Sequence, residues 1–396
     1  MRAMKTLKFL LCLLVIFNSC SCEEDKPEPL RGRTVLVYLA ADNNLSSFSE
    51  NDIDEMTKGV PELESTLDNL IVYVDNANGK PRLFHLKKSS TGIAVQENIW
   101  TYELQNSVNV EVMKDVFSRA FTAFPAASYG LVLWSHSDGW LPSSSSSSIS
   151  RSFGQDGSSK MNISQLHEVL KDYYFDFILF DACFMQSVEV LYELRDCCDY
   201  FVGSPTEIPG PGAPYQTVVK SMFTIDRNRN TAAFNVAEAY YDYYAANYNA
   251  GKNISNDNWT GGVAVSVVKT TELEQLATVV RNIFSQYLNG QTSIDVSDIM
   301  CYNPYQSNSY YYDLDGFIRS LTKSDTNYTV WQGVYRKAVP YYETTEKNYS
   351  AFGGMFSMEG SEGLSAYIPT KNLTSHTFYH SFAWYTAAGW DKTELF

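Results

Sequence analysis

From residue 33 onward, apolar runs alternate with amphipathic stretches along this chain. The apolar runs are typical of buried strands and cover 33–41, 69–75, 131–134, 177–180, 200–203, 262–268 and 363–369. Between them, apolar residues at helical spacing predict helices over 46–58, 110–124, 163–172, 187–196, 230–249 and 271–288. Strands that alternate with helices predict βαβ units, and hence an α/β fold with a mainly parallel sheet that helices cover on both faces.

The density of this pattern predicts the domain organisation. Strands and helices alternate closely over 33–215, which indicates an α/β core with a hairpin at 82–87 and 91–95. The pattern loosens over 216–396, and this region is expected to complete the sheet and to add a smaller, largely helical α+β subdomain. The 396 residues are enough for a large core of this kind.

Two of the predicted strands end in reactive side chains. His136 follows the apolar run 131–134, and Cys183 follows the run 177–180. Carboxyl ends of parallel strands lie at one edge of a sheet, so we expect the two side chains to meet there. A helix is expected directly after Cys183, where its N–H groups would favour the thiolate. A cysteine and a histidine are the smallest set of catalytic side chains that a cysteine hydrolase needs. Taken alone, each residue also fits a simpler role, as a core cysteine or a structural histidine.

Acyl transfer to a cysteine also needs hydrogen-bond donors for the tetrahedral oxyanion. Backbone N–H groups at the two strand ends are the natural suppliers. We therefore predict an oxyanion hole from the turn that contains Ser137 and Gly139, together with the amide of Cys183.

The segments around the two reactive residues resemble a known family. His136-Ser-Asp-Gly-Trp140 and Phe180-Asp-Ala-Cys-Phe-Met185 are similar to the histidine and cysteine segments of the clostripain family of cysteine peptidases, in the caspase-like clan. Tyr38–Leu45 and Gly363–Pro369 are further matches, so the resemblance spans about 33–370. It implies a caspase-like fold and an endopeptidase with a Cys-His dyad. Many clan members carry Gly directly after the histidine, where this chain has Ser137.

The resemblance also implies cleavage of protein or peptide substrates after Arg or Lys, which calls for a carboxylate in the substrate pocket. Asp181 matches the acidic residue of the family at this point, and strand alternation puts it on the same face as Cys183. Glu207 is a second candidate for the pocket wall. For this residue, however, a solvated loop carboxylate is the favoured interpretation.

Self-processing in the loop after the histidine is a further implication of the family. That loop covers 141–160 and contains the serine run Ser143–Ser148, which is expected to be mobile. We predict cleavage after Arg151, with Lys160 as the alternative. Some relatives depend on calcium. No EF-hand spacing occurs in the sequence, so neither a metal site nor a cofactor is predicted, and calcium dependence stays open.

The first residues have the pattern of a targeting segment. Three basic residues precede the short apolar run 9–17, which fits a signal peptide over 1–19. The cysteines that follow resemble a bacterial lipoprotein signal, with lipidation at Cys20 or Cys22 and a tether over 20–32. The protein is then expected outside the cytoplasm and anchored to a membrane, and the alternative is ordinary cleavage and secretion.

Composition narrows the remaining choices. The net charge of −15 argues against binding to nucleic acid and weakly favours basic substrates, although a soluble acidic surface explains it more simply.

Most cysteines other than Cys183 are interpreted as buried apolar residues, and histidines such as His167 have no partner pattern. Tyrosines cluster at 240–248 and 310–312. They fit core packing, or a platform for glycans in the alternative function, a non-catalytic surface lipoprotein. A monomer is expected.

Overall fold

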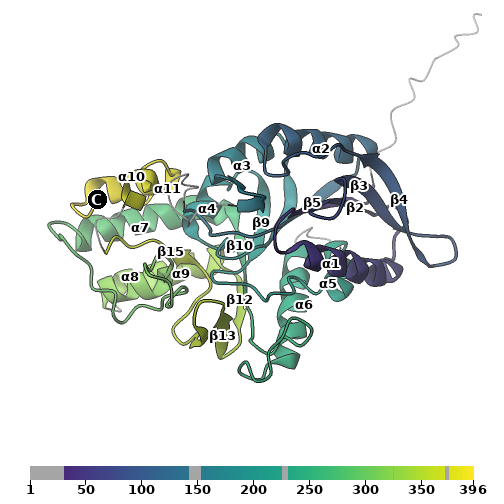
Figure 1. Ribbon diagram of the computed structural model, residues 1–396. Coiled ribbons are helices and arrows are strands. Elements are labelled where there is room, and N and C mark those ends of the chain that lie inside the picture. Colours follow the sequence, from purple (N-terminus) through teal and green to yellow (C-terminus); the bar gives the residue numbers. More distant parts are fainter. Residues whose placement is uncertain (1–30, 142–152, 225–230, 324, 371–373) are drawn as a thin grey trace, which may run out of the picture.

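A nine-stranded sheet forms the centre of the computed structural model, which describes residues 31–141, 153–224, 231–323, 325–370 and 374–396 (Figure 1). The strands lie in the order β12-β10-β9-β8-β5-β1-β2-β3-β4. Their bounds are β1 Arg33–Ala41, β2 Asn69–Asn76, β3 Arg82–Lys88, β4 Ala94–Thr101, β5 Ser128–Trp134, β8 Phe175–Asp181, β9 Cys198–Gly203, β10 Ala264–Lys269 and β12 Tyr341–Thr344.

The five central strands, from β9 to β2, run parallel, and antiparallel strands extend the sheet at both edges. Every residue of β1 is buried, because helices cover both faces of the sheet. Alternation along β1 sends Leu36 and Tyr38 into one core and Val35 and Val37 into the other. The predicted fold, a mainly parallel sheet flanked by helices, is confirmed.

The helices of the core cover the two faces in separate groups (Figure 1). On one face lie α2 (Val110–Ala123), α3 (Ile163–Leu170) and α4 (Val188–Glu193), and on the other α1 (Ser46–Gly59), α5 (Tyr215–Met222) and α6 (Thr231–Asn247). Local sequence sets where they begin. The Asn109 side chain accepts the N–H groups of Glu111 and Val112 at the start of α2, and Asn162 forms a capping box with Gln165 at α3.

The residues after α6 both complete the sheet and add helices beside it. β10 and β12 extend the sheet, and the apolar side chains of the following helices join the core of α2–α4. The remaining elements are short strands, helices and 3₁₀ turns: β6 Phe153–Asp156, β7 Ser159–Met161, β11 Tyr312–Asp313, β13 Lys347–Ser350, β14 Gly354–Ser357, β15 Ser365–Ala366, α7 Leu273–Tyr287, α8 Leu314–Thr322, α9 Thr326–Ala338, α10 Thr374–Tyr379, α11 Ala383–Ala387, η1 Val60–Glu62, η2 Thr270–Glu272 and η3 Trp390–Lys392.

Three local expectations are wrong. The strand predicted over 363–369 is reduced to β15, because the N–H of Tyr367 donates to Glu189 and not to a neighbouring strand. The segment 141–160 is not one loop, since β6 and β7 form a hairpin within it. Cys183 does not lie at a helix N-terminus, because a turn at Cys183 and Phe184 and the residues up to Ser187 separate it from α4, which begins at Val188.

Some predictions concern residues outside the described part of the chain. These are the signal peptide over 1–19, the lipidation sites Cys20 and Cys22, nearly all of the tether, and the serine run Ser143–Ser148. Among the residues that the structure does describe, no helix is both long and apolar enough to span a membrane.

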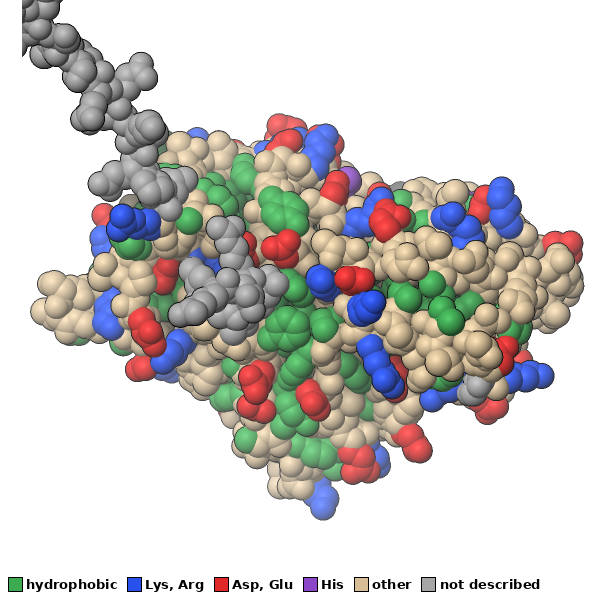
Figure 2. Space-filling model, turned by 180° about the vertical axis from the view of Figure 1, so that it is seen from behind, with side chains coloured by type: hydrophobic (Ala, Val, Ile, Leu, Met, Phe, Trp, Pro, Cys, Tyr) green, Lys and Arg blue, Asp and Glu red, His purple; other side chains and the backbone are tan. Residues whose placement is uncertain are grey.

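The surface of the described residues carries both signs of charge. On the face shown in Figure 2, Lys and Arg side chains lie among Asp and Glu side chains and do not gather into one basic patch. Proteins that bind nucleic acid usually present such a basic patch to the phosphate backbone. This face does not have it.

Candidate active site

The register of β5 and β8 brings the two reactive residues to one place. These strands are parallel neighbours, and their pairing sets Trp134 opposite Asp181. His136 and Cys183 each follow that pair by two residues, so both leave the sheet at the carboxyl edge of its parallel strands. Both line one cavity of about 290 Å³. The structure therefore brings together the histidine and the cysteine that the sequence singles out.

A tight turn after β8 holds Cys183. Phe184 has a φ of 60°, in the left-handed region that residues other than glycine rarely adopt. Its N–H donates to the Thr206 carbonyl at 3.0 Å, and its ring stacks on Tyr311 with the centroids 4.7 Å apart. The N–H of Ile208 lies 3.5 Å from the sulfur of Cys183 and donates to it. Contacts on both sides thus hold a strained turn that positions the thiol.

His136 is oriented by a residue to which the sequence analysis assigned no role. Its Nε2 lies 2.6 Å from Oδ1 of Asn44, which follows β1. An amide oxygen only accepts hydrogen bonds, so Nε2 carries the proton in this contact and Nδ1 keeps its lone pair. The backbone here is tied to the β6–β7 hairpin, because Gly154 N–H donates to the His136 carbonyl and Gln155 N–H to the Ser135 hydroxyl.

Both members of the pair are uncharged in this form at neutral pH. Burial, and then the carboxylate of Glu207, raise the pKa of the Cys183 thiol well above its usual value. Burial, and then the ammonium of Lys160, lower the pKa of His136. The expectation that a helix N-terminus stabilises the Cys183 thiolate is wrong, because α4 begins five residues later. A nucleophilic sulfur therefore forms here only when a base takes the thiol proton.

Asp181 lines the same cavity and is held by three donors, although it is only 1% exposed. The Ala213 N–H and the Tyr215 hydroxyl each donate to Oδ2 at 2.9 Å, and the Tyr240 hydroxyl donates to Oδ1 at 3.2 Å. Burial raises the pKa of Asp181 to about 6 despite these bonds. At pH 7 the cavity therefore contains a carboxylate that is mainly ionised.

The tyrosines that support this carboxylate were not predicted as part of the site. Tyr240 belongs to the cluster at 240–248, where Tyr244 is also buried and donates to the Gly212 carbonyl at 2.6 Å. The only sequence signal was their spacing of four residues on one helix face, which indicates packing. That packing interpretation is confirmed for both residues, and the cluster 310–312 is buried as well.

Glu207 is also a wall of the cavity. It is half-buried, its Oε1 accepts the Ala351 N–H at 3.2 Å, and burial raises its pKa. A solvated loop carboxylate is therefore the wrong description of this residue. By contrast, Ser137 and Gly139 are not among the residues that line the cavity, and the Gly139 N–H donates to the Ser137 hydroxyl at 3.0 Å. In this form, that amide is engaged inside its own turn.

The two predicted processing residues differ in position. Lys160 lies in β7, paired with Gln155 of β6, and its Nζ is 3.5 Å from a carboxylate oxygen of Asp138. A peptide bond inside such a paired strand is a poor protease site, because proteases need an accessible, extended segment. Arg151 lies outside the described residues.

Other hollows of the described surface lack this chemistry. One of about 370 Å³ lies at the opposite end of β1, beside Gly32 and Asp68, and no cysteine or histidine lines it. Another of about 320 Å³ lies next to the Cys183 cavity and shares Asn256 and Trp259 with it. Size alone would therefore select the wrong place, whereas the chemistry of the lining selects the Cys183 cavity.

A sheet that sets a cysteine and a histidine at its carboxyl edge defines the class of cysteine peptidases with a caspase-like fold. The chain matches the profile of the clostripain family, Peptidase_C11, over residues 37–394, and it belongs to that family. A comparison with curated proteins finds no match.

Solved structures agree with this assignment. The chain is 45% identical to a secreted C11 cysteine protease from Bacteroides thetaiotaomicron in complex with an irreversible peptide inhibitor, covering 91% of this chain and 100% of that one with a TM-score of 0.84. It is 32% identical to an inactive zymogen C11 protease from Parabacteroides distasonis, covering 91% and 99% with a TM-score of 0.79. A B. fragilis cysteine protease is 45% identical, covering 62% and 100% with a TM-score of 0.59.

The contact between Lys160 and the histidine region gives a prediction on pKa. In a Cys183→Ala chain, Lys160→Gln should raise the pKa of His136, because it removes a positive charge that disfavours the imidazolium. Burial is the larger cause, so the pKa should stay below about 6.5, the usual histidine value. NMR titration of the ring protons measures it, with His136→Gln to assign the signal. Lys171→Gln, which removes a lysine bonded to Glu168 on another surface, is the control. An unchanged pKa in Lys160→Gln would contradict the electrostatic account.

Proposed function

We propose that this member of the clostripain family is an endopeptidase that cleaves after Arg or Lys, with Cys183 as nucleophile and His136 as general base. One observation carries the proposal: Cys183, His136 and the carboxylate of Asp181 line a single cavity of about 290 Å³. The family membership supports cysteine peptidase activity, and the cavity chemistry supports the finer assignment.

The reaction follows from the protonation states described above. Nδ1 of His136 accepts the thiol proton as the sulfur attacks the peptide carbonyl, and the tetrahedral oxyanion takes hydrogen bonds from backbone N–H groups. The amide of Cys183 and those of the Ser137–Gly139 turn are the proposed donors, and Gly139 requires a rearrangement of its turn. The imidazolium then protonates the leaving amine, and water hydrolyses the thioester with His136 again as base.

The donors on Asp181 limit what it offers a substrate. A carboxylate has about four lone-pair sites, and three are already taken by Ala213, Tyr215 and Tyr240. The remaining site is on Oδ1, and it suits one N–H of a lysine or arginine side chain. Glu207 adds a second negative charge at the wall of the cavity, although burial raises its pKa.

We further propose that the chain processes itself after Arg151. In the sequence, a serine-rich stretch stands next to a basic residue, which is the kind of segment that a protease with a pocket for Arg or Lys cleaves. The description of the Parabacteroides distasonis relative as an inactive zymogen supports processing in this family. Because Lys160 is held in a strand, we place the cut at Arg151.

The first test compares the wild-type chain with Cys183→Ala and Arg151→Gln. Wild type should split near residue 151 and cleave fluorogenic Arg and Lys peptides, and both are assayed with calcium and with EDTA. Cys183→Ala should stay intact and lose peptidase activity, whereas Arg151→Gln should stay intact without losing the nucleophile. Intact mass spectrometry and peptide assays measure the outcomes. An intact, inactive wild type in both buffers would favour a non-catalytic surface protein instead, and identical fragments from Arg151→Gln would refute the processing site.

Specificity gives a second prediction, for Asp181→Asn. The amide keeps the shape and, with its oxygen at the Oδ2 position, the acceptor for Ala213 and Tyr215. It removes the charge and the acceptor on the Oδ1 side, so kcat/KM for Arg and Lys peptides should fall about 10- to 150-fold, as expected for a lost charge-assisted hydrogen bond. Labelling of Cys183 by a small uncharged alkylating agent should change far less. Asp199→Asn is the control, because Asp199 bonds Tyr174 at the surface. A variant with wild-type preference for basic residues would remove Asp181 from the pocket.

Finally, we propose that the chain is exported and anchored by a lipid on Cys20 or Cys22. The sequence around these two cysteines resembles a bacterial lipoprotein signal, and the Bacteroides thetaiotaomicron relative is described as secreted. In bacterial cells grown with a clickable palmitate analogue, the full chain should incorporate label and partition with membranes. Cys20→Ala and Cys22→Ala, made separately, identify the acceptor. A chain released to the medium without label would support ordinary secretion.

A further inference from the structure

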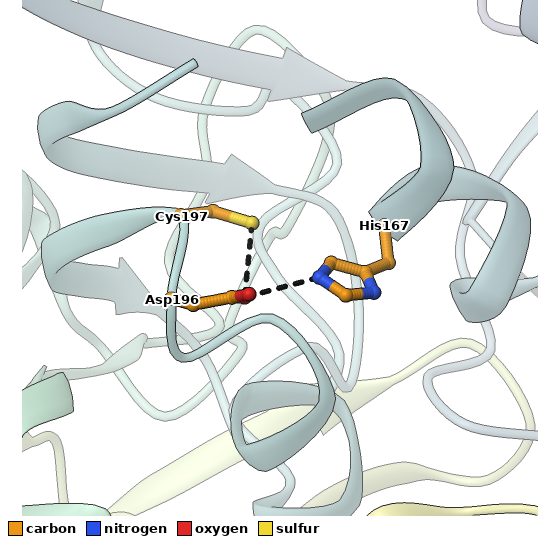
Figure 3. Close-up of side chains that lie close together, drawn as sticks. All are labelled: His167, Asp196 and Cys197. Atoms are coloured by element: carbon orange, nitrogen blue, oxygen red, sulfur yellow. Dashed lines mark hydrogen bonds and ion pairs between the residues drawn. The ribbon is translucent and has the colours of Figure 1, made fainter. Parts of the chain in front are cut away.

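A second group of reactive side chains lies away from the active site. His167 on α3 faces Asp196 and Cys197, which lie in the turn before β9 (Figure 3). Nε2 of His167 is 3.0 Å from Oδ1 of Asp196, and the Cys197 thiol donates to the same oxygen at 3.5 Å. All three ligand atoms lie within 4.8 Å of one another. The expectation that His167 has no partner is therefore wrong.

These spacings match those of a tetrahedral metal ion. Zinc bonds of about 2.0–2.3 Å to nitrogen, oxygen and sulfur put neighbouring ligand atoms about 3.3–3.6 Å apart. The distances of 3.0 Å and 3.5 Å to Oδ1 of Asp196 are close to that range, and the remaining pair of ligand atoms lies within 4.8 Å. One imidazole, one carboxylate and one thiolate form a donor set that suits Zn²⁺, whereas calcium and magnesium require oxygen ligands.

The three side chains differ in exposure, and the two that are exposed leave the cluster open to an ion from solvent. The Cys197 side chain is buried, that of His167 is 29% exposed and that of Asp196 is 63% exposed. Although burial opposes it, the His167 charge and nearby hydrogen bonds hold the pKa of Asp196 below its usual value. Burial, and then Asp196, raise the pKa of Cys197. The metal would therefore displace one proton from the thiol, and its affinity should rise with pH.

The cluster lies at the end of the sheet opposite to Cys183. Cys197 immediately precedes β9, and its carbonyl accepts the N–H of Phe175, the first residue of β8. His167 lies in the last turn of α3, on the face of the sheet that α2 and α4 also cover. An ion bound here would join α3 to the amino ends of β8 and β9.

We propose that His167, Asp196 and Cys197 form a zinc-binding site with one position left for water, and that the ion stabilises the fold without taking part in peptide cleavage. The sulfur–metal bond forms as the thiol proton leaves to solvent, and the nitrogen–metal bond forms as the proton that Nε2 of His167 donates to Asp196 leaves that nitrogen, so no oxidant or reductant is needed. The proposal is independent of the peptidase assignment, because the site shares no residue with the Cys183 cavity.

The test uses Co²⁺ and Zn²⁺ on the chain in a Cys183→Ala background, which removes the other cysteine that lies beside a histidine. Co²⁺ should bind with a stoichiometry of one and produce the near-ultraviolet charge-transfer band of a cobalt thiolate. Zn²⁺ should abolish the band by displacement, and a large excess of Ca²⁺ should not. Zn²⁺ should also raise the unfolding temperature.

Variants separate this site from unspecific binding. Cys197→Ser should remove the charge-transfer band, and His167→Gln should weaken Co²⁺ binding at least about 100-fold, beyond what loss of an outer-shell partner costs. Cys198→Ser is the matched control, because the adjacent buried thiol donates to the Tyr200 carbonyl. If Cys197→Ser fails to fold, the surface-accessible His167→Gln and Asp196→Asn still decide the question. Absence of a thiolate band in the parent chain, or its persistence in His167→Gln and Asp196→Asn, would overturn the proposal.

Discussion

The pairing of β5 with β8 is the constraint on which the candidate active site depends. With Trp134 opposite Asp181, the residues two positions further on, His136 and Cys183, leave the sheet together. A shift of one residue in this register would send the inward-facing side chains of one strand to the other face. Apolar residues fill both faces of these buried strands, and such a shift would also disrupt two cores. The packing of the whole sheet therefore enforces the geometry of the pair.

The same constraint extends to the substrate pocket. Asp181 is the last residue of β8, and a buried carboxylate is costly unless donors surround it. Those donors come from Ala213 and Tyr215 near the start of α5 and from Tyr240 on α6. The charge in the cavity is thus stabilised by residues remote from β8 in sequence, on both sides of residue 215. The alternation of strands and helices along the sequence changes at residue 215, but the pocket needs residues from both 33–215 and 216–396.

What the sequence could predict follows from the range of the interactions involved. Strands such as β1 and β8 were predictable, because continuous apolar runs are required wherever both faces are buried. The meeting of His136 and Cys183 was predictable from the rule on strand ends. The turn between Cys183 and α4 was not, because the N–H groups of Phe184 and Gln186 donate to the carbonyls of Thr206 and Ser204 and not within a helix. Asn44, Tyr215 and the partnership of His167 with Asp196 were missed for one reason: each contact is made by tertiary folding and leaves no local spacing pattern.

The β6–β7 hairpin couples the proposed processing segment to the proposed base. It begins two residues after Arg151 and donates to the Ser135 hydroxyl and the His136 carbonyl. It also contains Lys160, whose charge, after burial, lowers the pKa of His136. A neutral imidazole of lowered pKa is a weaker base, and the buried Cys183 thiol is a weaker acid than usual. Both shifts oppose proton transfer from sulfur to nitrogen. Movement of the hairpin away from His136 would remove the contribution of Lys160 to the first shift, and entry of a cationic substrate side chain beside Glu207 and Asp181 would reduce the second. The charge that the pocket is proposed to recognise is therefore also one that favours the thiolate.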